Sequence, residues 1–489
     1  MPKIIFVEPK ATEEHIFARF KLPRLGLLIL GTMIKKRGWD VEVIIENLSP
    51  IRIDDLSRAD IVGISAITNT VEKAYSLADR LRKKGVPAIL GGPHVTFMPD
   101  EALEHADFVL RGEAEFPFMD FIDAWEGRRP FTDVPGLSYM KDGIKTHNRP
   151  PEKPTVLDDL PVIDLSVLKN GDSLKVLPVQ TSRGCPFDCS FCSVTGMFGR
   201  KFRYRSTEHI MKELRTYRNM GKMIFFYDDH FAANKARAKE LLREMIREGL
   251  NFKWSTQVRV EVARDRELLE LMKRAGCHTL FIGFESVNPR SLVEMNKSQT
   301  IEDIKNAVSV IHSYGIHVHG MFVYGFENDT NEMVNQTVDF ATALDITSAQ
   351  FLILTPYPGT AFHHKVKESI ITSAWSLYDT HHVVFSPKNF SMMKLQYSQI
   401  KSHRKFYSMK RMINLIRRKK WLALGIAFYA RFINFLFVIQ NIRYFLKIIS
   451  HDRARAGAGS ITIRQAMSEL ENNQASVSEH YEKECHAMK

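Results

Sequence analysis

The first 125 residues alternate short apolar runs with amphipathic segments. The pattern predicts strands at KIIFVEP, VEVIIEN, IVGISAIT, AILGG and FVLRG, and helices at LGLLILGTMIKKRG, VEKAYSLADRLRKKG and ALEHA. Continuous apolar runs rich in β-branched residues, separated by helical segments, are typical of a parallel sheet covered on both faces. We therefore expect residues 1–125 to form a doubly wound α/β domain.

The rhythm of strand and helix stops and then returns. Residues 126–175 are rich in Pro, Gly and Asp, so a linker with a small hairpin is expected there. From 176 to 360 the pattern predicts strands at KVLPVQTS, MIFFYDD, FKWSTQV, TLFIGFES, HVHGMFVYG and AQFLILTP. About six β/α units predict a partial barrel, shorter than a closed eightfold one, with its chemistry at the carboxyl ends of the strands.

Residues 361–450 form a helical extension in this interpretation, followed by a polar tail over 451–489. Two apolar runs divided by Arg431 lie between 417 and 450, and neither reaches the roughly 18 to 20 residues that span a bilayer. The pattern favours membrane-surface helices over 411–449, with aromatic side chains in the interface at Trp421, Phe428, Phe432 and Phe435. The alternative is an apolar helical hairpin packed on the barrel.

Composition and charge narrow the classes of protein. The 489 residues are 44% hydrophobic and 25% charged, which excludes a disordered or collagen-like chain. The net charge is +12, yet residues 401–455 alone contain 14 Lys and Arg against one acid, Asp452, so the rest is near neutral. Nucleic acid is disfavoured because these cations lie among aliphatic residues. The N-terminus lacks a secretory pattern, so we expect a cytoplasmic protein with peripheral contact at the inner membrane face.

Cysteine usage points to a cofactor. Three of the five cysteines, Cys185, Cys189 and Cys192, follow an apolar strand with the spacing C-x3-C-x2-C in QTSRGCPFDCSFC. A loop of this length can bring three thiolates to the corners of an iron–sulfur cluster and leave one iron open to a non-protein ligand. A zinc site completed by a distant His is the alternative, although structural zinc favours paired C-x2-C units.

At these residues, with the aromatic Phe191 between the last two cysteines, the sequence resembles the radical S-adenosylmethionine superfamily. The resemblance implies a [4Fe–4S] cluster that chelates S-adenosylmethionine, a 5′-deoxyadenosyl radical that abstracts hydrogen, and an external electron donor. It also places cofactor contacts at four strand ends: Asp228 and Asp229 at the methionyl amino group, Gln257 and Arg259 at the carboxylate or ribose, Glu285 and Ser286 at the ribose, and Gly320 and Gly325 at the adenine. Helix N-caps are the alternative for the aspartates.

Small and polar residues also follow two strands of the N-terminal half. Ser65 and Thr68 end ISAIT, and Gly91, Gly92 and His94 lie in AILGGPHVT, where a doubly wound sheet opens its ligand crevice. Tight turns are the alternative. This half resembles the cobalamin-binding domain of cobalamin-dependent radical enzymes, which include bacteriochlorophyll ring-forming and hopanoid-modifying members. The Asp-x-His-x-x-Gly pattern after the first strand is absent, so the resemblance implies cobalamin without a protein imidazole below the cobalt.

The resemblance implies an enzyme that methylates or cyclises an unactivated carbon of an apolar or lipid-like substrate. Tyr357, just past a strand end, is a candidate to face that substrate, with a core tyrosine as the alternative. A methylthiotransferase acting on RNA or protein is a second hypothesis. It is disfavoured because no cysteine precedes Cys185. The third hypothesis is a non-enzymatic, metal-stabilised protein that docks on membranes.

Overall fold

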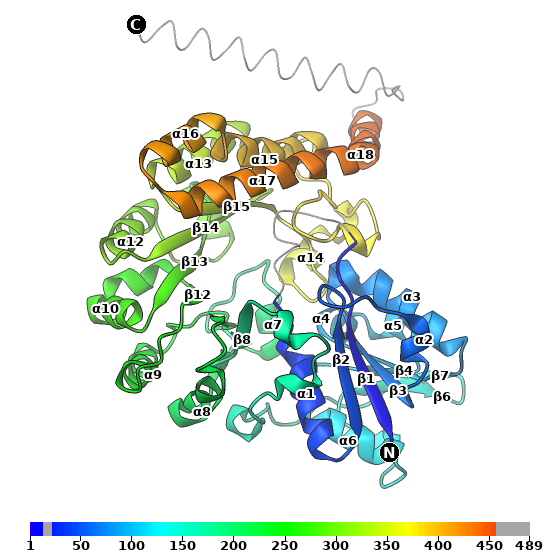
Figure 1. The fold of residues 1–489 in the computed structure, drawn as a ribbon. Coiled ribbons are helices and arrows are strands. Elements are labelled where there is room, and N and C mark those ends of the chain that lie inside the picture. Colours follow the sequence, from blue (N-terminus) through cyan, green and yellow to red (C-terminus); the bar gives the residue numbers. More distant parts are fainter. Residues whose placement is uncertain (13–21, 456–489) are drawn as a thin grey trace, which may run out of the picture.

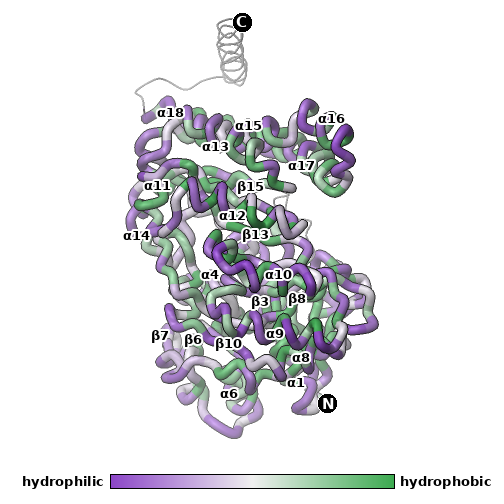
Figure 2. Tube along the Cα trace, turned by 90° about the vertical axis from the view of Figure 1, so that its left-hand side faces the viewer, coloured by the Kyte–Doolittle hydropathy of each residue, from purple (hydrophilic) through white to green (hydrophobic). Residues whose placement is uncertain are grey.

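The computed structural model describes residues 1–12 and 22–455, so the candidate tail beyond 455 lies outside the described residues. An N-terminal α/β region lies beside a second α/β region, and a group of helices covers the far end of the second one (Figure 1). In both views the C-terminal helices and the hairpin of the N-terminal region lie at opposite ends of the molecule (Figures 1 and 2).

The N-terminal sheet has seven strands in the order β2-β1-β3-β4-β5-β6-β7, and its first five strands are parallel. Its strands are β1 (Lys3–Glu8), β2 (Asp40–Ile45), β3 (Ile61–Ser65), β4 (Ala88–Gly91), β5 (Phe108–Leu110), β6 (Leu137–Lys141) and β7 (Ile144–His147). Its helices are α1 (Leu25–Lys36), α2 (Ile53–Leu56), α3 (Val71–Arg82), α4 (Pro93–Phe97), α5 (Pro99–His105) and α6 (Glu115–Trp125).

Alternate residues of each central strand enter two different cores. Ile4 and Phe6 of β1 belong to the core that α1 and α6 share, whereas Ile5 and Val7 belong to the core under α3. Side chains of successive strand residues point to opposite faces, so a strand covered on both faces must be apolar throughout. This arrangement confirms the doubly wound α/β fold.

The hairpin expected between 126 and 175 is present, but it belongs to the N-terminal sheet. β6 pairs antiparallel with β5, and β7 pairs antiparallel with β6. Residues 137–147 are therefore not a linker. They cover the edge of β5, which would otherwise expose unpaired backbone groups.

The second region contains six parallel strands in the order β15-β14-β13-β12-β11-β8, which confirms the partial barrel. The strands are β8 (Val176–Val179), β11 (Met223–Phe226), β12 (Trp254–Val258), β13 (Cys277–Glu285), β14 (His317–Tyr324) and β15 (Ser348–Ile353). A short antiparallel pair, β9 (Ser182–Arg183) with β10 (Arg203–Tyr204), flanks the loop that carries the three neighbouring cysteines.

Helices of the second region begin at polar caps. Ser206, Asn234, Asp265 and Thr300 each accept a hydrogen bond from the backbone of the first turn of α8, α9, α10 and α12 respectively. The helices are α7 (Val194–Phe198), α8 (Thr207–Tyr217), α9 (Lys235–Arg247), α10 (Arg266–Arg274), α11 (Pro289–Glu294), α12 (Ile301–Ser313), α13 (Asn331–Ala343) and α14 (Ala361–Val366).

Four helices complete the described chain: α15 (Met392–Phe406), α16 (Met409–Arg417), α17 (Trp421–Gln440) and α18 (Ile442–Arg455). Arg431 does not divide the helix: α17 runs through it as one helix of 20 residues, so residues of both apolar runs belong to a single helix that has the length of a bilayer span. By length and composition alone, α17 is the one helix among the described residues that could cross a membrane. Residues 451–455, expected to begin the polar tail, are the last turn of α18.

Candidate functional site

The three cysteines lie on one loop after the carboxyl end of β8, where they are free thiols of intermediate exposure. The amide of Cys192 donates to the carbonyl of Cys189 at 3.1 Å, which closes a tight turn between them. Burial raises the pKa of Cys192 to about 12, so this thiol keeps its proton until a metal displaces it. Three thiols on one loop are the donor set that a [4Fe–4S] cluster with one open iron requires. No group of three or more His, Cys, Asp or Glu within residues 1–12 and 22–455 is arranged to hold a single metal ion.

Neighbouring strand ends fix the cysteine loop. The carboxylate of Asp228 accepts hydrogen bonds from the amides of Thr181 and Ser182, at 2.7 and 3.0 Å. The guanidinium of Arg259 lies 3.7 Å from the ring centre of Phe187, inside the loop. Asp228 is therefore bound to the backbone that leads into the cysteines. It does not cap the following helix, whose N-cap is Asn234.

Asp229, the neighbouring acid, is an exposed residue at the same strand end. Although the residue is exposed, the protein around its carboxyl group removes part of its water, and this desolvation, with the charge of Asp228, raises the pKa of Asp229 to about 7. The charge of Arg183 and a hydrogen bond from the Gly184 amide act in the opposite direction. An ammonium group of a bound ligand would stabilise its charged form. The predicted contact of Asp229 with an amino group is compatible with this position and stays a prediction.

The end of β13 holds an unusual backbone conformation. Glu285 has φ of 62°, and its carboxylate pairs with the ammonium of Lys297. Such left-handed residues are costly unless surrounding structure holds them, and they cluster at functional sites. Ser286 is buried and accepts a hydrogen bond from the Asn288 amide at 3.0 Å. Gln257, at the end of β12, is exposed. The ligand contacts predicted for these three residues stay predictions.

Gly320 in β14 and Gly325 directly after it each have a structural reason to be glycine. A Cβ on Gly320 would lie 2.7 Å from the ring of Phe284 and 2.9 Å from Ile346, so its small size serves packing. Gly325 has φ of 114°, and its amide donates to Asp329 at 2.9 Å. A left-handed turn after β14 therefore requires glycine at 325. The adenine contact predicted for Gly320 and Gly325 stays a prediction.

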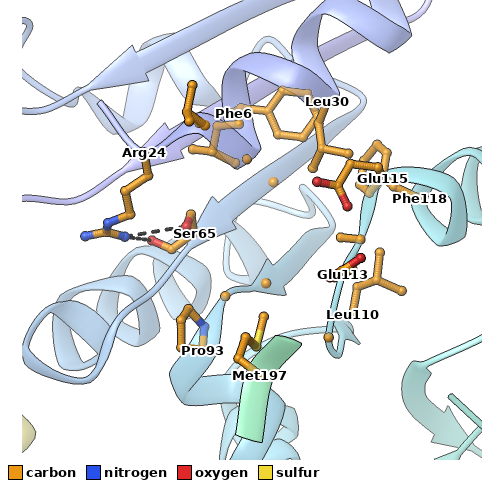
Figure 3. A pocket seen from close by; sticks show the side chains of 18 of the residues that line it. Phe6, Arg24, Leu30, Ser65, Pro93, Leu110, Glu113, Glu115, Phe118 and Met197 are labelled. Atoms are coloured by element: carbon orange, nitrogen blue, oxygen red, sulfur yellow. Dashed lines mark hydrogen bonds between the residues drawn. The ribbon is translucent and has the colours of Figure 1, made fainter. Parts of the chain in front are cut away.

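A cavity of about 290 Å³ opens at the carboxyl edge of the N-terminal sheet, against the second region (Figure 3). Ser65, Gly91 and Gly92 line it, as predicted for a ligand crevice. Arg24 points to Ser65 and donates to its carbonyl at 3.3 Å. A Cβ on Gly92 would lie 2.5 Å from the Ala66 carbonyl, and Gly92 has φ of 109°, so the two loops meet only because this residue is glycine.

Groups from the second region close the same cavity. Gln180 and Arg183, just before the three cysteines, and Met197 and Phe198, just after them, line it. Tyr227, at the carboxyl end of β11, lines it as well. In Figure 3, Met197 lies beside Pro93 of the N-terminal region. The lining is mostly apolar, with a few polar groups that include the buried pair Arg183–Glu115, which suits a large cofactor.

His94 does not line this cavity. It is buried beside Trp375, with ring centres 4.8 Å apart, and its Nε2 lies 3.5 Å from a carboxylate oxygen of Glu101. Thr68 and Tyr357 instead line a second cavity of about 240 Å³, together with Ser193, which follows Cys192. The structure thus brings Tyr357 next to the cysteine loop from the end of β15, although 165 residues separate it from Cys192.

Buried ion pairs join the two α/β regions beside the cysteines. Arg183, directly ahead of the loop, pairs with Glu115 at 2.5 Å, and both side chains are about 5% exposed. Arg203 pairs with Glu113, and its guanidinium also donates to the Thr155 carbonyl at 2.9 Å. Glu113 and Glu115 follow β5, so the sheet edge and the cysteine loop are fixed to each other.

Sequence reasoning missed several groups around the cysteines. Lys297 faces Glu285, and Arg24 holds Ser65. His230 lies with its ring centre 6.1 Å from that of Phe187, and burial lowers its pKa to about 4, so it is neutral at physiological pH. The position of His230 directly after Asp229 was the only available signal, and it is weak.

Comparison with known proteins matches both regions. Residues 17–122 match the B12 binding domain, and residues 179–341 match the radical SAM superfamily. The chain is 34% identical over 406 residues to an uncharacterized methyltransferase of Pyrococcus horikoshii, covering 79% of this chain and 88% of that one. It is 30% identical over 426 residues to the bacteriochlorophyllide d C-12(1)-methyltransferase of Chlorobaculum tepidum, covering 84% of this chain and 89% of that one.

A solved structure shares the arrangement of the regions. The cobalamin-dependent S-adenosylmethionine radical enzyme OxsB, with aqua-cobalamin and S-adenosylmethionine bound, aligns with a TM-score of 0.68 at 16% identity. The alignment covers 98% of this chain and 81% of OxsB. The methylthiotransferase and non-enzymatic hypotheses are not favoured by these comparisons. The chain belongs to the cobalamin-binding radical S-adenosylmethionine enzymes, whose cofactors are a [4Fe–4S] cluster, S-adenosylmethionine and cobalamin.

Proposed function

We propose that this enzyme transfers a methyl group to an unactivated carbon of an apolar or lipid-like substrate. The observation that carries the proposal is the shared cleft: the cavity of the N-terminal sheet is closed by residues that flank the three cysteines. Two cofactors held on these two sides would face one reacting carbon. Placing reacting groups in register in this way can supply much of the rate enhancement.

The bound cofactors supply homolytic chemistry at the cluster and a transferable methyl group at the corrin. The chain supplies the holding groups. Cys185, Cys189 and Cys192 would bind the cluster, and Asp229 would receive the amino group of S-adenosylmethionine. Arg259 is 7% exposed beside the loop and suits a carboxylate, since a guanidinium offers paired donors.

The second cavity supports an apolar substrate. Ile67, Pro93, Phe97 and Pro358 contribute apolar surface to it, and the polar residues Thr68, Asn69, Ser193, Tyr357 and Asp379 complete its lining. Burial raises the pKa of Tyr357 above its usual range, so its phenol keeps its proton and can donate a hydrogen bond. We infer that Tyr357 orients a substrate oxygen while the apolar wall excludes water.

The relatives support methyl transfer, since the two described above are methyltransferases by name. A magnesium-protoporphyrin IX monomethyl ester cyclase of Cereibacter sphaeroides is also related, at 27% identity over 436 residues. Ring closure is therefore the competing outcome. Both outcomes need one electron for the cluster, which we assign to an external donor protein.

The test is anaerobic turnover with S-adenosylmethionine carrying a deuterated methyl group, a chemical reductant and an apolar extract. Methyl transfer predicts 5′-deoxyadenosine, S-adenosylhomocysteine and a deuterium-labelled apolar product. Ring closure predicts 5′-deoxyadenosine with no S-adenosylhomocysteine and no label in the product. Tyr357→Phe should keep 5′-deoxyadenosine formation without substrate and lower product yield by about tenfold. An unchanged product yield would remove Tyr357 from the proposal.

A further inference from the structure

An apolar stripe follows the outer side of α17 and continues into α18. Large, apolar and exposed residues recur here at intervals of seven, four, three, four and three residues: Trp421, Phe428, Phe432, Phe435, Ile439 and Ile442. Trp421 is 63% exposed and Phe435 is 60% exposed. At 1.5 Å per residue the part of the stripe on α17 is about 27 Å long. We call these six residues the outer stripe.

The inner side of α17 is fixed to the protein. Ala423, Ala427, Ala430, Ile433 and Phe437 are buried, and α17 packs on α15, α16 and the edge strand β15. The small alanines allow close approach of the neighbouring helices. A helix held in this way would expose its inner face and uncover α15 if it left to cross a bilayer. We therefore expect α17 to stay packed on the protein and to present the outer stripe as part of the folded surface.

Cations border the outer stripe without acidic partners. Among the residues that the structure describes, six basic side chains around it form no ion pair: Lys410, Arg417, Lys419, Arg431, Arg443 and Lys447. Asp452, the one acid between 409 and 455, is used inside the fold, where it accepts hydrogen bonds from the amides of Met392 and Met393 at 2.8 Å. The free positive charge thus faces outward.

A second apolar row extends the same surface on α16. Met409, Ile413 and Ile416 are about half exposed and follow helical spacing. At the junction of α16 and α17, a cavity of about 540 Å³ is lined by Lys419, Lys420 and Trp421, and also by Asp345, which pairs with Lys420. A basic, aromatic rim around an apolar centre is typical of proteins that sit in the headgroup region of a bilayer.

We propose that the outer stripe and its basic border dock the enzyme peripherally on an anionic lipid bilayer. Two copies meeting through this face would bring two uncompensated basic borders together, which disfavours a dimer. Nucleic acid would meet a row of large aliphatic and aromatic side chains in place of a continuous basic track. The docking face lies on α17 beside β15, one edge of the partial barrel, so docking would bring the barrel edge close to lipid-dissolved molecules.

The test is co-sedimentation of the holoenzyme with phosphatidylcholine vesicles, with and without phosphatidylglycerol. The wild type should pellet with anionic vesicles, and added salt should release it. The variant Phe428→Ser/Phe432→Ser/Phe435→Ser should bind on the order of tenfold more weakly. The matched control Ile144→Ser/Val293→Ser alters two exposed apolar residues elsewhere and should bind as the wild type does.

A charge series separates lipid binding from general stickiness. The variant Arg417→Glu/Arg443→Glu/Lys447→Glu should bind anionic vesicles more weakly, by on the order of tenfold or more. The control Lys83→Glu/Lys141→Glu, which alters exposed sites elsewhere, should bind them as the wild type does. Iron content and cluster absorption check that each variant is folded. The proposal is overturned if the wild type stays in the supernatant, if the serine variant pellets equally, or if the face instead forms dimers or binds RNA in preference to vesicles.

Discussion

The N-terminal region and the second region, which meet at the cavity, contribute different kinds of residues. The second region gathers ionisable and strained groups at its strand ends: three thiols, Asp229 with a raised pKa, and Glu285 in a left-handed conformation. The side on the N-terminal sheet is mostly apolar and carries glycines where bulk must be absent. Reactive groups need tuned charge, whereas a bound cofactor mainly needs space and shape. We infer that one side performs chemistry and the other holds its partner in place.

The largest effect on activity is expected from removing one thiol of the cysteine loop. Cys189→Ala leaves two ligands, so we expect loss of the cluster and a fall of roughly a thousandfold or more in 5′-deoxyadenosine formation. Iron analysis and product chromatography of anaerobically purified protein measure this. Cys277→Ala is the matched control, because Cys277 is buried in β13 away from the loop. Equal iron in the two variants would contradict the assignment.

Filling the cavity of the N-terminal sheet should weaken corrinoid binding without affecting the iron–sulfur cluster. A Cβ on Gly91 has only the Leu110 carbonyl oxygen near it, at 3.9 Å, so Gly91→Phe can project into the cavity. We expect roughly hundredfold weaker corrinoid binding with iron content unchanged. Gly91→Ala should bind corrinoid as the wild type does. If Gly91→Phe keeps stoichiometric corrinoid in its absorption spectrum, the cofactor lies elsewhere.

The pair Arg183–Glu115 tests whether the two sides depend on each other. Because both side chains are buried, Arg183→Met alone leaves an unpaired carboxylate and should cost about 3–5 kcal/mol. Arg183→Met/Glu115→Leu should recover most of this loss. Thermal unfolding of the single and double variants measures the difference. Equal melting temperatures for both would show that the pair does not couple the regions.

The smallest expected effect is on the pH dependence of stability, through the carboxyl group of Asp229. Its pKa is raised to about 7 in the folded protein, above the 3.8 of an ordinary aspartate, so the folded state binds the extra proton. Stability of the cofactor-free protein should therefore fall as pH rises from about 4 to about 7. Asp229→Asn should flatten this part of the profile. An unchanged slope in denaturant titrations would show that the carboxyl group of Asp229 is fully solvated in the folded protein.

Local sequence patterns predicted much of this molecule. Strand runs, helix periods and the spacing of Cys185, Cys189 and Cys192 are encoded within a few residues, so both α/β regions and the cysteine loop could be expected. The crevice residues Ser65, Gly91 and Gly92 also line the cavity. They were predictable because parallel strands end at one edge of their sheet.

Long-range contacts explain what could not be predicted. Glu115 lies 68 residues before its partner Arg183, and the strand β6 joins β5 across a segment that looks like a linker. Asp228 and Asp229 are adjacent, yet the first is buried and binds backbone amides whereas the second is exposed. Arg431 did not interrupt α17, because a long side chain can keep its charge in water while its helix packs on one face.

The shared cleft can be tested most directly by the magnetic interaction between the two cofactors. The enzyme would be loaded with a reduced [4Fe–4S] cluster and with cobalt(II) corrin, then studied by electron paramagnetic resonance at low temperature. Our account predicts that each signal is split or relaxes faster when the other centre is present, and that Gly91→Phe removes this change. Two unperturbed signals in a protein holding both cofactors would contradict the account.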